Sequence, residues 1–264
     1  MVLAPPAPPL SASPYERWYR HFDEHRDDVN ALPWRDSYRL NATELRNVAR
    51  SIQQFQLGEW ARGRGLKQRA LRQTDLAGDR WFIPALELFV QEEQRHSTTL
   101  GRFLDLQHIP RLRVHWLDGI FRRLRKLAGL DVCATVLVTA EALAMPFYQA
   151  LRDATGSKLL RSICAGLLVD EAAHLNYQGL TLGLIRRPRS DRSKVMRGFC
   201  HRVLFDGSAL LLWQQHRRVF RAAGWNFFRF WNEAHRWFAI LEMKIRNVAS
   251  SQRRIELRAE SRLD

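Results

Sequence analysis

The chain has 264 residues, of which 46% are hydrophobic, and this is enough to build one large buried core. The formal net charge of +15 comes from arginines spread along the chain, which predicts attraction to acidic partners unless it only reflects an arginine-rich proteome. Three distant cysteines without a CxxC pair argue against a disulfide framework or a thiolate zinc site, and they predict reduced, mostly buried thiols.

The N-terminal segment gives no sign of a secretion signal. Residues 1–14 read MVLAPPAPPLSASP, where prolines interrupt the apolar residues and no basic flank precedes them, so we expect a disordered segment. The most apolar run, from Val132 to Leu151, carries Glu141 at its centre, which argues against a membrane span. These features predict a cytoplasmic protein without a transmembrane segment.

The rest of the chain predicts an all-α fold, because glycine and proline are sparse and apolar residues recur at three- and four-residue steps. A short helix is expected within Tyr15 to Asp36, where it would cover a bundle. Four long helices should follow, one beginning near Thr43 with Asn41 as its cap, and the others covering Asp79 to Leu106, Asp131 to Ala154, and Lys158 to Ile185.

The predicted organisation has three parts. They are an N-terminal segment (1–36), a four-helix bundle (37–188) and a helical C-terminal extension packed on the bundle (189–264). The extension is dense in aromatic residues, which favours core packing or a subunit interface over a substrate site. These aromatic residues are Trp213, Phe220, Trp225, Phe227, Phe228, Phe230, Trp231, Trp237 and Phe238.

Two ExxH motifs carry the chemistry that can be read from the sequence. Glu93 and His96 lie in the second long helix, and Glu171 and His174 lie in the fourth. Residues three apart share one face of a helix, so each pair can present a carboxylate and an imidazole to one point. One such motif arises easily by chance, and its significance therefore depends on its surroundings.

Those surroundings favour a metal site. Each motif falls on the apolar stripe of its helix, and Glu59 and Glu141 lie on the core faces of the other two helices. A lone buried carboxylate costs several kcal/mol unless it is compensated, and a metal ion compensates it directly. The spacing also repeats, because Glu93 follows Glu59 by 34 residues (93 − 59) and Glu171 follows Glu141 by 30 (171 − 141).

The predicted ligands are therefore four carboxylates and two imidazoles around one bundle centre. Two divalent ions would balance the four negative charges, and this donor set suits two iron ions or, alternatively, manganese. The alternative is a set of satisfied polar core residues without metal. The six predicted metal ligands are Glu59, Glu93, His96, Glu141, Glu171 and His174.

The motifs resemble those of the ferritin-like di-iron carboxylate superfamily. The segments EEQRH (92–96) and DEAAH (170–174) are most similar to the EExRH and DExRH motifs of acyl-carrier-protein desaturases, and the flank RSICAGLLVDEAAH (161–174) adds to the likeness. The resemblance covers about residues 43–186. Two positions depart from the desaturase pattern, since Ala173 replaces the arginine and Ala144 stands where a threonine lies near the oxygen site.

The resemblance implies a role for each ligand. Glu59 and His96 would bind one metal, Glu141 and His174 the other, and Glu93 and Glu171 would bridge the two. The residues that precede the bridging glutamates would either orient a histidine or form ordinary surface ion pairs. These residues are Glu92 and Asp170.

The resemblance favours an oxygen-dependent di-iron oxidoreductase with a small-molecule or carrier-bound, apolar substrate. An acidic protein partner or electron donor and a small homo-oligomer are expected with it. Iron storage, a tRNA-modifying di-iron hydroxylase and a non-catalytic helical scaffold remain as alternatives, of which the tRNA enzyme would require nucleic-acid binding. A narrow pocket near the ligands is expected to be lined by Phe55, Phe89, Leu137 and Tyr148.

The remaining histidines are weaker ligand candidates, and the three in the extension, His201, His216 and His235, are expected to be surface or packing residues. A basic run after Glu59 is either a solvated face or a docking site for an acidic partner. The histidines are His21, His25, His108, His115, His201, His216 and His235. The basic run consists of Arg62, Arg64, Lys67, Arg69 and Arg72.

Overall fold

The computed structural model describes residues 13–25, 32–61, 70–71, 76, 78–113 and 129–260, with side chains for all of these except 60, 61 and 251–260. Several predictions from the sequence lie outside these residues. They concern the segment 1–12, His115 and all five residues of the basic run from Arg62 to Arg72.

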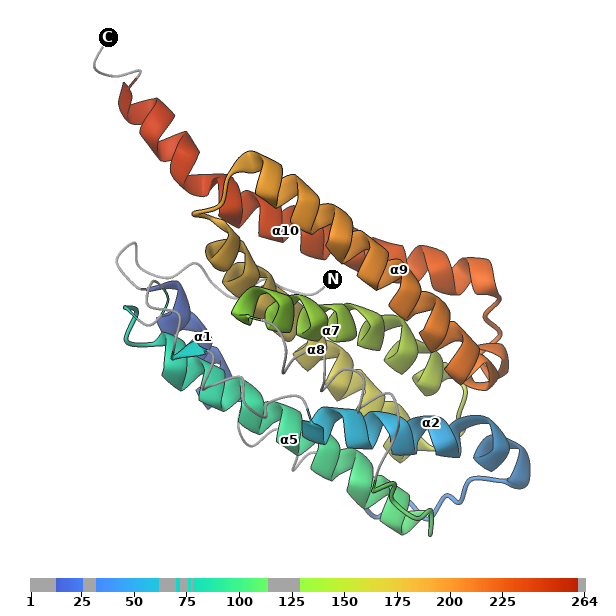
Figure 1. Ribbon diagram of the computed structural model, residues 1–264. Helices are drawn as coiled ribbons and strands as arrows, with labels where there is room; N and C mark the ends of the chain where they lie inside the picture. Colours follow the sequence, from blue (N-terminus) through green and yellow to red (C-terminus); the bar gives the residue numbers. More distant parts are fainter. Residues whose placement is uncertain are drawn as a thin grey trace.

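The described part of the chain contains seven helices and no strand, which confirms the all-α prediction (Figure 1). In chain order they are α1 (Pro14–Glu24), α2 (Ala42–Ala61), α5 (Phe82–Leu106), α7 (Leu130–Asp153), α8 (Lys158–Arg186), α9 (Asp191–Ala222) and α10 (Phe227–Glu260).

Local capping explains where the bundle helices begin. The Asn41 side chain accepts hydrogen bonds from the backbone amides of Thr43 and Glu44, and the Glu44 carboxylate accepts one from the Asn41 amide. This reciprocal arrangement satisfies amides that would otherwise lack partners in the first turn of α2. Helix α5 begins three residues later than predicted, because the Asp79 carboxylate accepts from the Trp81 amide and holds a turn before the helix.

The helices form a bundle with added helices. Helix α2 packs against α5, and α7 packs against α8, as in the two predicted hairpins. The hairpins lie side by side, because α5 also contacts α8. The α9–α10 hairpin covers α7 and α8 on one side, and α1 packs on α5 (Figure 1). The division of the chain at residues 36 and 188 stays a prediction.

Helix α7 is the only described helix that is long and apolar enough to cross a membrane. However, 89% of its most apolar window is buried inside the bundle, as expected for a core helix. Its neighbours α8, α9 and α10 supply that cover.

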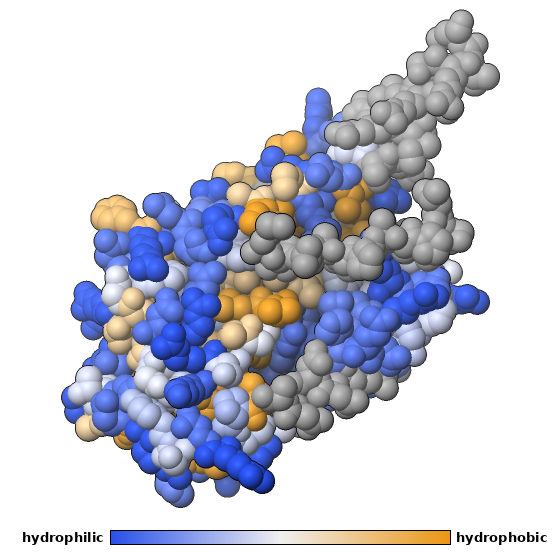
Figure 2. Space-filling model, turned by 180° about the vertical axis from the view of Figure 1, so that it is seen from behind, coloured by the Kyte–Doolittle hydropathy of each residue, from blue (hydrophilic) through white to orange (hydrophobic). Residues whose placement is uncertain are grey.

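The extension packs mainly through its aromatic residues, as predicted. Phe220, Trp225, Phe230 and Phe238 are buried, whereas Phe228 is 74% exposed and therefore does not follow the prediction. Figure 2 shows the molecule from behind relative to Figure 1. This face is mostly hydrophilic, and its hydrophobic residues lie in separate places.

The cysteines follow their prediction in part. Cys133 and Cys164 are buried, as expected for structural thiols. Cys200 is exposed, because it lies on the outer face of α9, where no described helix covers it.

Candidate metal centre

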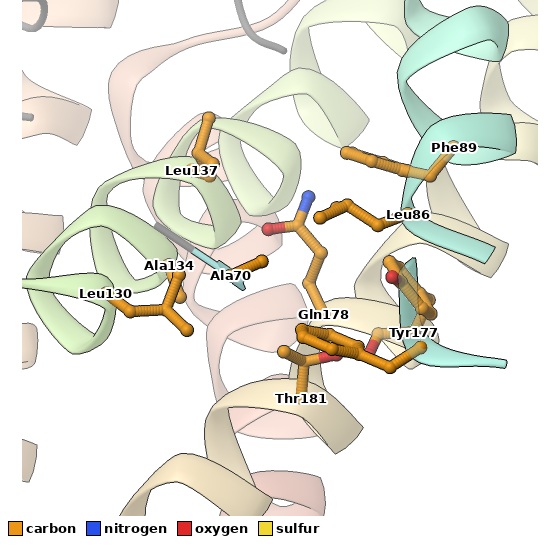
Figure 3. A pocket seen from close by; sticks show the side chains of 10 residues that line it. Ala70, Leu86, Phe89, Leu130, Ala134, Leu137, Tyr177, Gln178 and Thr181 are labelled. Carbon is orange, nitrogen blue, oxygen red and sulfur yellow. The ribbon is translucent and has the colours of Figure 1, made fainter. Parts of the chain in front are cut away.

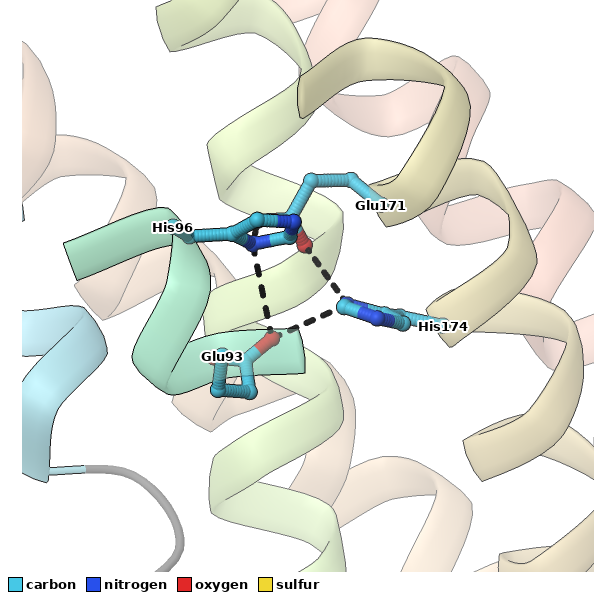
Figure 4. Close-up of side chains that lie close together, drawn as sticks. All are labelled: Glu93, His96, Glu171 and His174. Atoms are coloured by element: carbon cyan, nitrogen blue, oxygen red, sulfur yellow. Dashed lines mark ion pairs between the residues drawn. The ribbon is translucent and has the colours of Figure 1, made fainter. Parts of the chain in front are cut away.

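The two ExxH motifs meet in the middle of the bundle. Glu93 and His96 project from α5, Glu171 and His174 project from α8, and all four side chains turn toward one point (Figure 4). One ligand atom from each lies within 4.8 Å of the others, and all four residues are buried. The helical phase read from the sequence is the cause, because each motif lies on the stripe that faces the core.

Both glutamates of the motifs lie between the two histidines. A Glu93 carboxylate oxygen is 2.9 Å from Nδ1 of His174 and 4.0 Å from Nδ1 of His96. Glu171 instead uses both of its oxygens, one at 3.9 Å from Nδ1 of His96 and the other at 3.6 Å from Nδ1 of His174. A carboxylate in such a position can bind two ions at once.

The other two predicted ligands, Glu59 and Glu141, are fully buried beside this cluster. Glu141 lies 3.7 Å from Nδ1 of His174, and the Gln178 amide donates a hydrogen bond of 2.9 Å to it. Glu59 accepts a hydrogen bond of 2.6 Å from the Tyr148 hydroxyl. Sequence reasoning missed both donors, because Tyr148 read as apolar lining and Gln178 belongs to no motif.

Each histidine is held from behind by the carboxylate that precedes the opposite motif. Nε2 of His174 is 2.8 Å from Glu92, and Nε2 of His96 is 3.0 Å from Asp170. The contacts cross between α5 and α8, so they also tie the two helices together. Of the two readings of Glu92 and Asp170, the structure supports orientation of a histidine, although Glu92 also pairs with Arg95 at 2.8 Å.

Without a metal, the crowded carboxylates raise the pKa values of groups in the cluster. Burial raises the pKa of Glu171, and the neighbouring Glu141 carboxylate raises it further, to well above its usual range. Burial lowers the pKa of His174, but the four surrounding carboxylates outweigh it and raise this pKa well above its ordinary value. The pKa of His96 is raised for the same reason, with Asp170 as the strongest partner.

The donor set fits a metal ion. Nδ1 of His96 is buried and makes no hydrogen bond among the described residues, while its Nε2 is engaged by Asp170. The two ring nitrogens of His174 differ in the same way, because Nε2 is bonded to the Glu92 carboxylate and Nδ1 faces the cluster. Metal-binding histidines use one nitrogen for the metal and the other for such a partner.

An apolar cavity of about 20 Å³ lies beside the cluster, and the Gln178 side chain extends into it (Figure 3). It has room for little more than one water-sized molecule. Its lining includes Phe89 and Leu137 as predicted, but Phe55 and Tyr148 are not part of it. Phe55 instead stacks on Phe147, with ring centroids 3.5 Å apart.

Helix α1 closes the side of the cluster that His174 occupies. Phe22 is fully buried, and its ring lies 6.0 Å from that of His174. Tyr15 and Trp18 anchor the same helix in the core, so the predicted covering helix exists and is built by an aromatic stripe.

The described histidines of the extension are packing residues, as predicted. His201 pairs with Glu242 at 2.7 Å, His216 with Ser51 at 2.9 Å, and His235 with Asp206 at 2.9 Å. None of them belongs to the metal-competent cluster found in the described residues.

Comparison with protein-family models, curated proteins and solved structures gives no match for this chain. The candidate site therefore rests on its own residues.

Proposed function

We propose that the protein is an oxygen-dependent di-iron oxidoreductase that acts on an apolar substrate. The observation that carries the proposal is the buried cluster of Glu93, His96, Glu171 and His174, with a carboxylate behind each histidine. Resemblance of these segments to the ferritin-like desaturase motifs supports it. Bound iron would supply the capacity to reduce dioxygen and oxidise a substrate.

The chain would hold the two ions through six residues. Glu93 and Glu171 lie between the histidines, which supports bridging roles. The position of Glu141 next to His174 supports one shared ion for that pair, which leaves Glu59 and His96 for the other. Four carboxylates with only two imidazoles favour iron or manganese over zinc.

The surrounding residues would position the ligands and exclude water. Glu92 and Asp170 fix the histidine rings, while Tyr148 and Gln178 fix the terminal carboxylates. Phe22 and Phe89 cover His174 with apolar rings, which restricts water at that ion. The apolar cavity beside Gln178 gives a small molecule such as dioxygen a dry place next to the site.

The proposal extends to the setting of the protein. A cytoplasmic location agrees with three cysteines that form no disulfide, and an acidic electron donor agrees with the net charge of +15. A small homo-oligomer is part of the same proposal.

Metal analysis with an optical spectrum tests the proposal directly. The purified protein should hold about two iron or manganese ions per chain. Glu93→Ala and Glu171→Ala should each reduce this content to less than about half, because each removes a shared ligand. Glu242→Ala is the matched control, since it removes another buried carboxylate paired with a histidine, and it should retain both ions.

The reaction with dioxygen separates an enzyme from a storage protein. The reduced protein should consume dioxygen and change its spectrum, and apolar ligands should perturb that spectrum. Full metal retention in both alanine variants contradicts the ligand assignment. A hollow shell that mineralises hundreds of irons contradicts the enzyme and favours storage.

A further inference from the structure

The outer face of α9 carries an apolar stripe that no described element covers. Val195, Met196, Phe199 and Val203 follow one another at helical spacing, and their exposed fractions lie between 56% and 74%. On α10, Met243 is also 59% exposed. Apolar residues that gather in this way on one surface mark a contact with another molecule.

The stripe begins at a strongly basic corner where α8 passes into α9. Between residues 186 and 203 the chain has seven cations and one acid, Asp191. The cations are Arg186, Arg187, Arg189, Arg192, Lys194, Arg197 and Arg202. Asp131 neutralises part of this charge through Arg186 and Arg197, whereas Arg189 and Arg192 are exposed to solvent.

The groove between α9 and α10 combines the same two properties. Two adjoining hollows of about 580 and 520 Å³ share Arg202, Phe238 and Arg246 in their linings. Phe199 and Ile245 add apolar lining, and Lys194 adds a further cation. The one acid in the linings, Glu242, is bonded to His201. A groove with an apolar floor and a cationic rim suits an amphiphile with a negative headgroup.

We propose that this face, residues 186–203 with the adjoining groove, docks the protein on an anionic membrane surface. The aliphatic side chains and Phe199 would enter the boundary between headgroups and acyl chains, while the basic corner meets the lipid phosphates. A second copy of the chain fits less well, because two such basic corners would repel each other. The inference does not depend on the metal centre.

Vesicle flotation tests the docking with the full-length protein. The protein should float with vesicles of phosphatidylcholine that contain about one-third phosphatidylglycerol, and much less with phosphatidylcholine alone. High salt should release it, because exposed charges are screened. Phe199→Glu should weaken binding about tenfold or more, since it replaces a ring that would enter the lipid by a charge that the anionic headgroups repel.

Phe228→Glu is the matched control. Phe228 is as exposed as the stripe residues but lies in the first turn of α10, at the opposite end of the hairpin, so this variant should bind vesicles like the parent protein. A joint Arg189→Glu and Arg192→Glu variant should lose binding roughly fivefold or more. Unchanged melting temperatures would show that the variants fold, as expected for exposed positions.

Cys200 offers a direct readout of contact. It is the exposed thiol next to Phe199, whereas Cys133 and Cys164 are buried, so a polarity-sensitive dye should label it selectively. Its emission should shift to the blue on addition of anionic vesicles. No vesicle binding, or equal losses in Phe199→Glu and Phe228→Glu, would overturn the proposal. So would an oligomer that Phe199→Glu dissociates in the absence of any vesicle binding, which would assign the face to a second copy.

Discussion

The two ExxH halves of the cluster contain the same ligand types but lie in different surroundings. His174 is fully buried, and its partner Glu92 has a side-chain exposure of only 4%. His96 is bonded to Asp170, which is 34% exposed. The terminal carboxylates differ too, because a tyrosine holds Glu59 and an amide holds Glu141.

The cause of this difference lies outside the motifs. Helix α1 places Phe22 over His174, while Asp170, the partner of His96, is left partly open to solvent. Water can therefore compete at Asp170 but not at Glu92. Two motifs of the same type thus differ in solvent access, with a closed side at His174 and an open side at Asp170. Matched substitutions on the two sides can measure how much this difference affects metal binding and stability.

The largest effect is expected from metal removal, which acts on both halves at once. The metal-free protein should melt about 5 °C or more below the metal-loaded protein at neutral pH, which corresponds to ~2 kcal/mol. Clustered carboxylates that lose their ions repel one another and must be neutralised by protons. Calorimetry of both forms measures the difference.

The same metal-free protein should become less stable as pH rises. The raised pKa of His174 stabilises the folded state fully below the ordinary value of 6.5, and this contribution is lost as pH rises through the raised pKa. Glu171 acts in the same direction above its ordinary value of 4.5, because its folded form retains a proton that the unfolded chain has lost. A melting temperature that stays constant from about pH 6 to about pH 9 would contradict the raised pKa values of His174 and Glu171.

The next effect separates the closed side from the open side. Glu92→Gln should weaken metal binding about 10- to 100-fold, because it removes the charge that orients His174. Asp170→Asn should have a smaller effect, since solvent can support His96 at that partly exposed position. Titration against a competing chelator ranks the two variants. Equal losses would mean that burial of the outer carboxylate is irrelevant.

The smallest effect compares the donors to the terminal carboxylates. Tyr148→Phe should lower the free energy of unfolding by about 1–2 kcal/mol, because it deletes a buried hydrogen bond to a carboxylate. Gln178→Met should cost less, since an amide N–H is a weaker donor to a carboxylate than the more acidic phenol O–H of Tyr148. Denaturant unfolding of the metal-loaded proteins measures both changes, and the reverse order would contradict this ranking.

Much of the architecture could be predicted because it depends on local periodicity. Three- and four-residue steps predicted four bundle helices to within a few residues, and Asn41 marked the start of α2. The same periodicity predicted that both ExxH motifs face the core. It could not predict Tyr148 and Gln178 as partners of Glu59 and Glu141, since both contacts join residues 37 or more positions apart.

The sequence by itself determined the residue types of the cluster and the helix faces that carry them. Helical spacing fixes those faces wherever the chain is helical. Only the tertiary structure decided which carboxylate serves which histidine, with Glu92 crossing to His174 and Asp170 crossing to His96. It also decided that α1 covers one histidine and that none of the described helices covers the apolar stripe of α9. These outcomes depend on how helices far apart in the chain pack together, and no local pattern encodes that.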